Sequence, residues 1–208
     1  MLFTAIPTAF LEKLHLAHCR EHIETMFLCS SAPVLRKVRP AVLITLRPHC
    51  LSAWHARQNA LRKATGLRTL EIMDSRGLTM LLIYDEHALG NSLMESETLD
   101  FLASHGYPAS FGLDEALDVL KKRFFEEGFP HEIGVFLGYP LKDVQAFIEN
   151  KGKNYVYCRY WKVYHDIDQA KEIFRRIDDA QRHALEVLRK PVPVHVAADL
   201  LKSAGYPA

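Results

Sequence analysis

A histidine followed by a glutamate, His131-Glu132, is a pair of side chains in this sequence that could do acid–base chemistry. A histidine titrates near neutral pH, so it can act as a general base, and with a neighbouring carboxylate it can hold a metal ion. Lys151 is predicted to lie at the same edge of the fold. In the other interpretation the imidazole bonds the backbone and the carboxylate caps a neighbouring segment. Both interpretations stay open.

A run of aromatic and basic residues from Tyr155 to Tyr164 supplies the second group of candidates. Buried strands of parallel sheets are usually rich in Val, Ile and Leu, and this run is not. It is therefore either an edge strand, with tyrosine hydroxyls reaching water, or the lining of a pocket for a flat or anionic ligand. The residues predicted to bind a ligand are Tyr139, Arg159, Trp161, Lys162, Tyr164 and Lys151.

Histidines and cysteines near the N-terminus have spacings that could hold a metal ion. His15, Cys19 and His22 lie three and four residues apart, which places them on one face of a predicted helix. Surface histidines are common on amphipathic helices, so a chance arrangement is the favoured explanation. His131 and Cys158 are the other candidate metal ligands, and all five remain hypotheses based on residue type.

A cysteine or serine nucleophile would need a group that activates it. Cys29 follows a predicted helix instead of beginning one, so no helix dipole lowers the pKa of its thiol. Cys158 is predicted to lie buried in the middle of a strand, and Ser31 would need a base that the sequence does not place. The sequence contains no nucleophile elbow, phosphate-binding loop or dinucleotide-binding glycine motif. Whether the protein is an enzyme therefore stays open.

Hydrophobic periodicity and turn residues predict the elements that must position these side chains. Strands are predicted over 40–46, 67–74, 78–85, 133–137 and 155–164, and helices over 9–28, 52–65, 95–104, 114–127, 140–150, 166–188 and 194–204. This order indicates a single-domain α/β fold with a mixed, partly parallel sheet of about five strands covered by helices, and a C-terminal β-α-β-α unit. The domain is predicted to span residues 1–190, with 191–208 as a short C-terminal helical appendage.

The predicted β-α-β unit of residues 133–164 determines where the candidate residues would meet. Its two strands would be parallel, with a right-handed crossover. His131, Glu132 and Lys151 would then lie at the amino edge of the sheet, and Tyr139 and Tyr164 at the carboxyl edge. Open α/β sheets usually bind ligands at the carboxyl edge, where helix N-termini offer free N–H groups. That edge is the predicted site.

Composition argues against several classes of protein. The chain has 26 basic and 25 acidic residues and a net charge of +1, a balance that disfavours nucleic-acid binding. No apolar run reaches the roughly 18 residues that cross a bilayer, and the apolar start lacks the basic leader and cleavage site of a signal peptide. Four widely spaced cysteines without a CxxC pair disfavour a disulfide framework. We therefore expect a cytoplasmic protein with no membrane partner.

One long segment resembles a known family. It reads FPHEIGVFLGYPL over 129–141, continues with Asp143-Val144 and FIENKG over 147–152, and ends with YWKVY over 160–164. This signature is similar to that of domain-of-unknown-function family 3793, found mainly in anaerobic bacteria. The resemblance extends more weakly over residues 21–180, where the blocks 31–33 (SAP) and 39–41 (RPA) are similar to the family's N-terminal block.

The resemblance also implies a physiological setting. It associates the chain with iron or redox physiology, and makes haem, flavin or iron the cofactors to test. The family usually has a cysteine where this chain has Ser31, and several cysteines around the YWKVY block, where this chain keeps Cys158. These departures weaken any account in which cysteines hold a metal.

Three functional hypotheses follow. The leading one is a cytosolic binding or accessory protein for a small ligand or cofactor, with its site around Tyr139 and Trp161. The second is a hydrolase or transferase that uses His131 with Glu132, or a nucleophile at Ser31 or Cys29. The third is a homodimeric interaction module, whose apolar seam would be formed by Val194, Ala197, Leu200 and Leu201.

Overall fold

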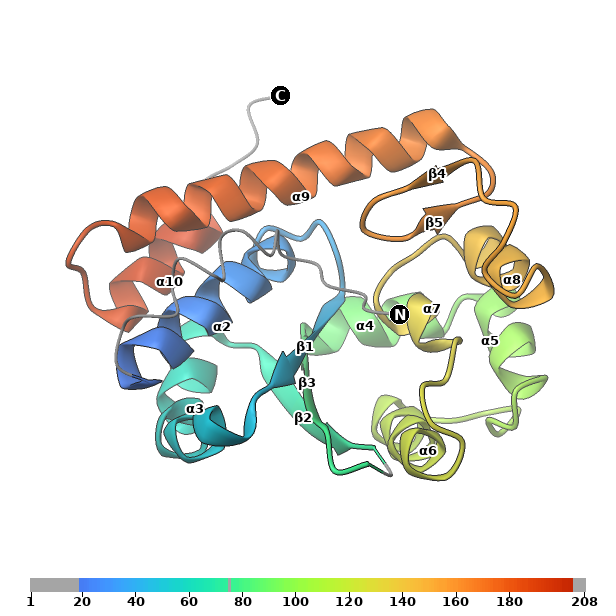
Figure 1. Ribbon diagram of the computed structural model, residues 1–208, viewed down its shortest axis with the longest axis horizontal. Helices are drawn as coiled ribbons and strands as arrows, with labels where there is room; N and C mark the ends of the chain where they lie inside the picture. Colours follow the sequence, from blue (N-terminus) through green and yellow to red (C-terminus); the bar gives the residue numbers. More distant parts are fainter. Residues whose placement is uncertain (1–18, 75, 204–208) are drawn as a thin grey trace.

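A three-stranded antiparallel sheet lies between two layers of helices in the computed structural model, which describes residues 19–74 and 76–203 (Figure 1). The described chain begins with α2 (Cys19–Leu35), β1 (Ala41–Leu46), the 3₁₀ helix η1 (Pro48–Cys50), α3 (Leu51–Thr65) and β2 (Arg68–Met73). It continues with β3 (Thr79–Tyr84), α4 (Glu86–Leu93), α5 (Ser96–Ala103), α6 (Leu113–Glu126) and α7 (Ile133–Phe136). It ends with α8 (Leu141–Glu149), β4 (Tyr157–Cys158), β5 (Lys162–Val163), α9 (Ile167–Leu188) and α10 (Val194–Ser203).

β3 is the central strand of the sheet, because it pairs with both β1 and β2. Successive side chains of a strand point to opposite faces, and both faces of this sheet are covered. Leu81 and Ile83 therefore face a core completed by α2, α3, α9 and α10. Met80 and Leu82 face a second core, completed by α4, α5, α6 and α7. This double burial explains why β3 is apolar along its length.

The predicted mixed sheet of about five strands is wrong. β1, β2 and β3 lie where strands were predicted, but every pairing among them is antiparallel. The predicted strand over 133–137 is instead the short helix α7. A Cβ atom on Gly134 would lie 2.7 Å from Cγ2 of Val144, so glycine at this position lets α7 pack directly on α8. A short apolar run of this kind fits a buried strand or a buried helix turn equally well. Here the packing of the run against α8 selects the helix.

The predicted strand over 155–164 is also wrong, because the chain folds back on itself within it. β4 and β5 pair antiparallel, with Cys158 opposite Lys162, and form a short hairpin. Residues 133–164, all of which the structure describes, therefore contain no parallel crossover. The predicted amino and carboxyl edges disappear with it, and the candidate residues are brought together in a different way.

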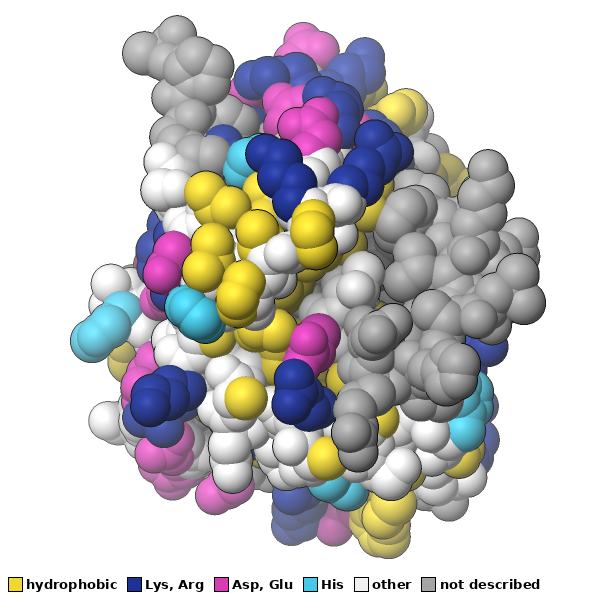
Figure 2. Space-filling view, turned by 90° about the vertical axis from the view of Figure 1, so that its left-hand side faces the viewer, with side chains coloured by type: hydrophobic (Ala, Val, Ile, Leu, Met, Phe, Trp, Pro, Cys, Tyr) yellow, Lys and Arg dark blue, Asp and Glu magenta, His cyan; other side chains and the backbone are white. Residues whose placement is uncertain are grey.

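α9 runs along one side of the molecule, from the β4–β5 hairpin at one end to α10 at the other (Figure 1). Ala197 and Leu201 of α10, two residues of the predicted dimer seam, are buried in the same core as α2 and α3. Leu200 remains 39% exposed. Figure 2 shows the end of the molecule where α10 lies, and hydrophobic side chains gather there below a group of charged side chains.

Candidate functional site

A buried carboxylate, Asp143, joins the β4–β5 hairpin to the first turn of α8. Its side chain is 4% exposed, and its Oδ2 atom accepts a hydrogen bond of 2.8 Å from the indole Nε1 of Trp161. Its Oδ1 atom accepts the backbone N–H groups of Tyr164 at 2.9 Å and of His165 at 3.1 Å. The Nδ1 atom of His165 lies 3.2 Å from the same oxygen. We call these four residues the Asp143 cluster. Because every partner comes from residues 161–165, the cluster determines where the hairpin sits.

Stacked aromatic rings hold Trp161 in place from its other sides. Its ring stacks on Tyr139 with 5.0 Å between centroids, and it makes an edge-to-face contact with Phe174 of α9, with 4.4 Å between centroids. Arg39, itself buried, lies 5.0 Å above the Tyr139 ring and donates a 3.0 Å hydrogen bond to the carbonyl oxygen of Leu137. Such aromatic pairs add about 1 kcal/mol each to the energy of burial. Trp161 is therefore a rigid wall and not a mobile side chain.

Between this wall and α7 lies a partly open pocket, which we call the aromatic pocket. Its cavity is small, about 30 Å³, and its interior is mostly apolar. It is lined by Phe129, His131, Ile133, Gly134, Leu137, Tyr139, Asp143, Val144, Phe147, Trp161 and Lys162. A concave apolar site with a few polar groups is the usual form of a small-molecule site. Three of the predicted ligand-binding residues, Tyr139, Trp161 and Lys162, lie together here.

Lys162 provides the cationic group of the aromatic pocket. Its Nζ atom donates a 2.6 Å hydrogen bond to the carbonyl oxygen of Gly152, and lies 4.8 Å from the centre of the Tyr155 ring and 5.6 Å from that of Phe147. Gly152 has a φ of +70°, and a Cβ atom there would lie 3.0 Å from the Phe147 ring and 3.3 Å from the Lys162 ammonium. A glycine is therefore required at this turn, because the backbone has a positive φ and the neighbouring side chains leave no room for a Cβ atom.

His131 and Glu132 point to different surroundings, although they are adjacent in the sequence. His131 is exposed, lines the aromatic pocket and makes an edge contact with Phe147 at 5.1 Å between ring centroids. Glu132 is 2% exposed and is paired with the guanidinium of Arg123 on α6, with the hydroxyl of Tyr107 3.4 Å away. Burial and the nearby Glu132 carboxylate raise the pKa of Tyr107 above its usual range. Glu132 therefore joins α6 to α7.

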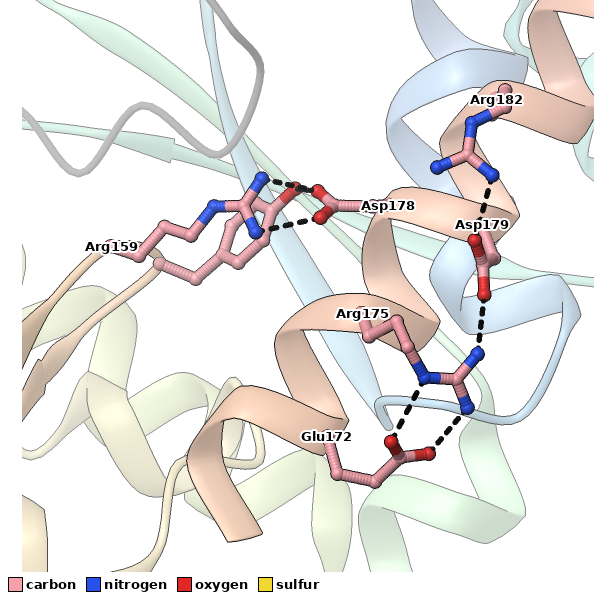
Figure 3. A network of polar contacts seen from close by, with 7 residues as sticks. Arg159, Glu172, Arg175, Asp178, Asp179 and Arg182 are labelled. Carbon is pink, nitrogen blue, oxygen red and sulfur yellow. Dashed lines mark hydrogen bonds and ion pairs between the residues drawn. The ribbon is translucent and has the colours of Figure 1, made fainter. Parts of the chain in front are cut away.

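The remaining predicted ligand-binding residues lie away from the pocket lining. The Arg159 guanidinium forms an ion pair with Asp178 of α9, with 2.6 Å between Nη1 and Oδ2 (Figure 3). Lys151 is exposed in the turn after α8. Tyr164 is half-buried, and its hydroxyl finds no hydrogen-bond partner within the described part of the chain. Figure 3 shows that the Arg159–Asp178 pair is one of several ion pairs along α9.

The candidate nucleophiles lie in settings that do not activate them. Cys29 is buried in α2, and burial raises the pKa of its thiol to about 12. Ser31 is fully buried, and its hydroxyl has no hydrogen-bond partner, and so no base, among the described residues. Cys158, predicted to be buried in a strand, is exposed on β4 because the hairpin is a surface element. These positions give no support to a cysteine or serine mechanism.

Three of the candidate metal ligands come from the N-terminal part of the chain. His15 and the side chains of Cys19 and His22 lie outside the described residues. Among the side chains that the structure describes, those of residues 23–74 and 76–203, no three of His, Cys, Asp or Glu come together in a way that could hold a metal ion. In the same part of the chain, no helix has the length and apolar character that crossing a membrane would require.

Sequence reasoning missed Asp143, Phe129 and Phe147 as residues of the site. Phe147 is half-buried on α8 and lines the pocket. Asp143 had one local signal: it is an acidic residue directly before Val144, on the face of α8 that is otherwise apolar. Buried carboxylates are rare unless they are paired, so an acid at that position indicates a structural partner elsewhere in the chain.

Comparisons with known proteins place the chain in a family. The model of a family described as "Protein of unknown function (DUF3793)" matches residues 27–196, which include the whole aromatic pocket. The chain belongs to this family. No curated protein and no solved structure matches the chain.

Proposed function

We propose that this member of the DUF3793 family is a binding or accessory protein that takes a compact, largely apolar small molecule into the aromatic pocket. The observation that carries the proposal is a partly open apolar cavity with one ammonium group, Lys162, among its lining side chains. The cavity of about 30 Å³ has room for one small apolar group, and its open side leaves space for the rest of the ligand at the mouth. A haem or flavin ring system is larger than that, so the pocket favours a smaller ligand.

The rigidity of the walls supports this proposal. The Asp143 cluster holds Trp161 from one side, and Tyr139 and Phe174 hold it from the others. Gly134 brings α7 against α8 on the opposite side of the pocket. A site whose walls are already in place loses little conformational entropy when a ligand binds, so that modest contacts suffice for affinity.

The hydrolase or transferase alternative has no comparable observation in its favour. His131 and Glu132 face different partners, and Cys29 and Ser31 are buried without an activating base in the described residues. A nucleophile needs a base within hydrogen-bond reach. We therefore base the proposal on binding.

The test uses the two tryptophans of the chain as reporters. In a ¹H–¹⁵N spectrum each indole N–H gives a separate resonance: Trp161 lines the pocket, whereas Trp54 is buried in the other core. Titration with benzyl alcohol at millimolar concentration is expected to shift the Trp161 resonance and leave that of Trp54 in place. If Trp161 does not move, or both resonances move together, the proposal is wrong.

A matched pair of variants localises the binding. Phe129→Ala removes a 39% exposed ring that lines the pocket, and Phe125→Ala removes a 58% exposed ring that does not. We expect Phe129→Ala to weaken benzyl alcohol binding by roughly fivefold, because about half of a phenyl contact is lost. Phe125→Ala should leave the affinity unchanged. Equal effects of the two variants would contradict the assignment of the site.

A further inference from the structure

The segment that borders the aromatic pocket is strongly one-sided in charge. From Asn150 to His165 the chain has four basic residues, Lys151, Lys153, Arg159 and Lys162, and no acidic residue. Arg159 is neutralised by Asp178, whereas the three lysines form no ion pair with any described carboxylate. The whole chain is nearly neutral, so this local excess belongs to the surface around the pocket. A field of this sign attracts anions to the opening.

Lys162 is held in position by groups that leave its charge uncompensated. Its Nζ atom donates one hydrogen bond, to the carbonyl oxygen of Gly152 at 2.6 Å. Its other close neighbours are the faces of the Tyr155 and Phe147 rings, which attract a cation without neutralising it. An ammonium has three N–H donors. Donors therefore remain for a ligand, on a side chain that already lines the pocket.

The acidic group of the pocket is in the opposite situation. Asp143 also lines the pocket, but its two oxygens accept hydrogen bonds from the Trp161 indole and from two backbone N–H groups. Because these donors surround it and its side chain is only 4% exposed, the carboxylate presents little surface to a cationic ligand. His131, which also contacts the Phe147 ring, adds a group that can donate a hydrogen bond but brings no negative charge. The available polar contacts at the pocket are those that an anion needs.

We infer that the ligand is a compact organic anion, whose carboxylate or phosphate group binds the Lys162 ammonium while its apolar group contacts Phe147 and Trp161 in the pocket. This inference rests on the proposed function and names the class of ligand for the same site. The cationic alternative is disfavoured because it would place a second positive charge beside Lys162.

A series of probes with one shared ring and different charges tests the inference. Benzoate, benzyl alcohol and benzylammonium are titrated separately into the full-length protein, with the Trp161 indole resonance as the readout. Benzoate is expected to bind about tenfold more tightly than benzyl alcohol, because of a charged hydrogen bond to Lys162. Benzylammonium is expected to bind more weakly than benzyl alcohol. Phenyl phosphate, as a fourth probe, distinguishes a preference for phosphate from one for carboxylate.

Variants of two lysines assign the effect to one ammonium. Lys162→Met should remove the advantage of benzoate over benzyl alcohol, and Lys162→Arg should restore part of it. Lys171→Met is the matched control, since Lys171 lies 5.9 Å above the Tyr157 ring but does not line the pocket, and it should leave the advantage intact. An unmoved Trp54 resonance shows in each case that the fold is retained.

The possible results separate the inference from the proposed function. If benzoate and benzyl alcohol bind equally well, or benzylammonium binds best, the anion inference is overturned while the binding function stands. If no probe shifts Trp161, both are overturned. An advantage for benzoate that survives Lys162→Met would also contradict the inference, because the charge would then be recognised elsewhere.

Discussion

Replacing Asp143 by asparagine is expected to destabilise the protein strongly, although the two side chains have nearly the same shape. The Asp143 carboxylate accepts from the Trp161 indole on one oxygen and from two backbone N–H groups on the other. An asparagine has a single acceptor oxygen, and its amide nitrogen is a donor. If its oxygen stays on the backbone groups, its NH₂ group faces the indole N–H, and two donors meet in a buried space.

The magnitude follows from these contacts. Leaving the buried indole N–H without an acceptor costs about 1–3 kcal/mol, and the two backbone hydrogen bonds lose the strength that a charged acceptor gives them. We therefore expect the free energy of unfolding of Asp143→Asn to fall by about 3 kcal/mol. That is a large fraction of the stability of a typical domain. The hairpin, and with it the pocket wall, should loosen first.

A double-mutant cycle measures the contact itself. Trp161→Phe removes the indole donor, so in the double variant the clash between two donors is absent. We expect the double variant to be less destabilised than the sum of the single variants, by about 1.5 kcal/mol. Urea unfolding followed by circular dichroism measures the free energies without depending on tryptophan fluorescence. Asp118→Asn on the exposed face of α6 is the control, with an expected change below about 0.5 kcal/mol.

Two results would refute the reasoning. A loss below about 1 kcal/mol for Asp143→Asn would mean that the buried carboxylate does not hold the hairpin. Strict additivity of the two substitutions would mean that Asp143 and Trp161 do not interact energetically, whatever the 2.8 Å distance between Oδ2 and Nε1 suggests.

Three further predictions concern the supports of the site. Gly138→Ala should lower the thermal unfolding temperature and destabilise the fold by about 3 kcal/mol, because Gly138 has a φ of +73° and a Cβ atom there would lie 2.4 Å from Cδ of Pro40. Glu132→Gln should lower the free energy of unfolding in urea by about 3 kcal/mol, because it breaks a buried ion pair. His131→Ala should lower it by less than about 0.5 kcal/mol. The reverse order would contradict the structural role of Glu132. Burial, and then its hydrogen bond to a carboxylate, raise the pKa of Tyr160 above its usual range, so the folded state keeps a proton that the unfolded state loses. Stability should therefore be complete below about pH 10 and fall as the pH rises further, and in pH-dependent unfolding Tyr160→Phe should make this fall shallower; an unchanged slope would show that this phenol is not involved.

The amphipathic helices and the three strands of the sheet could be predicted from the sequence because their signals are local. α6 and α9 each place an apolar residue on one face every three or four positions over many turns, which no strand would do. Gly77 indicates the hairpin of β2 and β3, and its φ of +79° suits a turn. Membership of the family also followed from the sequence, through the signature over 129–164.

Some residues of the candidate site could be predicted from the sequence, and others could not. Trp161 and Lys162 were identified because so many aromatic and basic residues are unusual in one short segment. Tyr139 was chosen for a different reason, its place at the carboxyl edge of a parallel unit that the structure does not contain. Arg159 belongs to the same segment but is held by Asp178, nineteen residues further along the chain. Residue type identifies groups that could bind a ligand, but it does not show which of them the fold has already paired.

The shape of segment 133–164 was decided by tertiary structure. Ile133–Phe136 is short enough to form either a strand or a helix turn, and the close approach of Gly134 to Val144 selects the helix. The run from Tyr155 to Tyr164 has the β-propensity of one long strand, with no glycine or proline to mark a turn. It folds as a hairpin because Asp143, eighteen residues before Trp161, holds the second half against α8. Local propensity differs by only about 1 kcal/mol between such alternatives, and a buried carboxylate with three donors outweighs it.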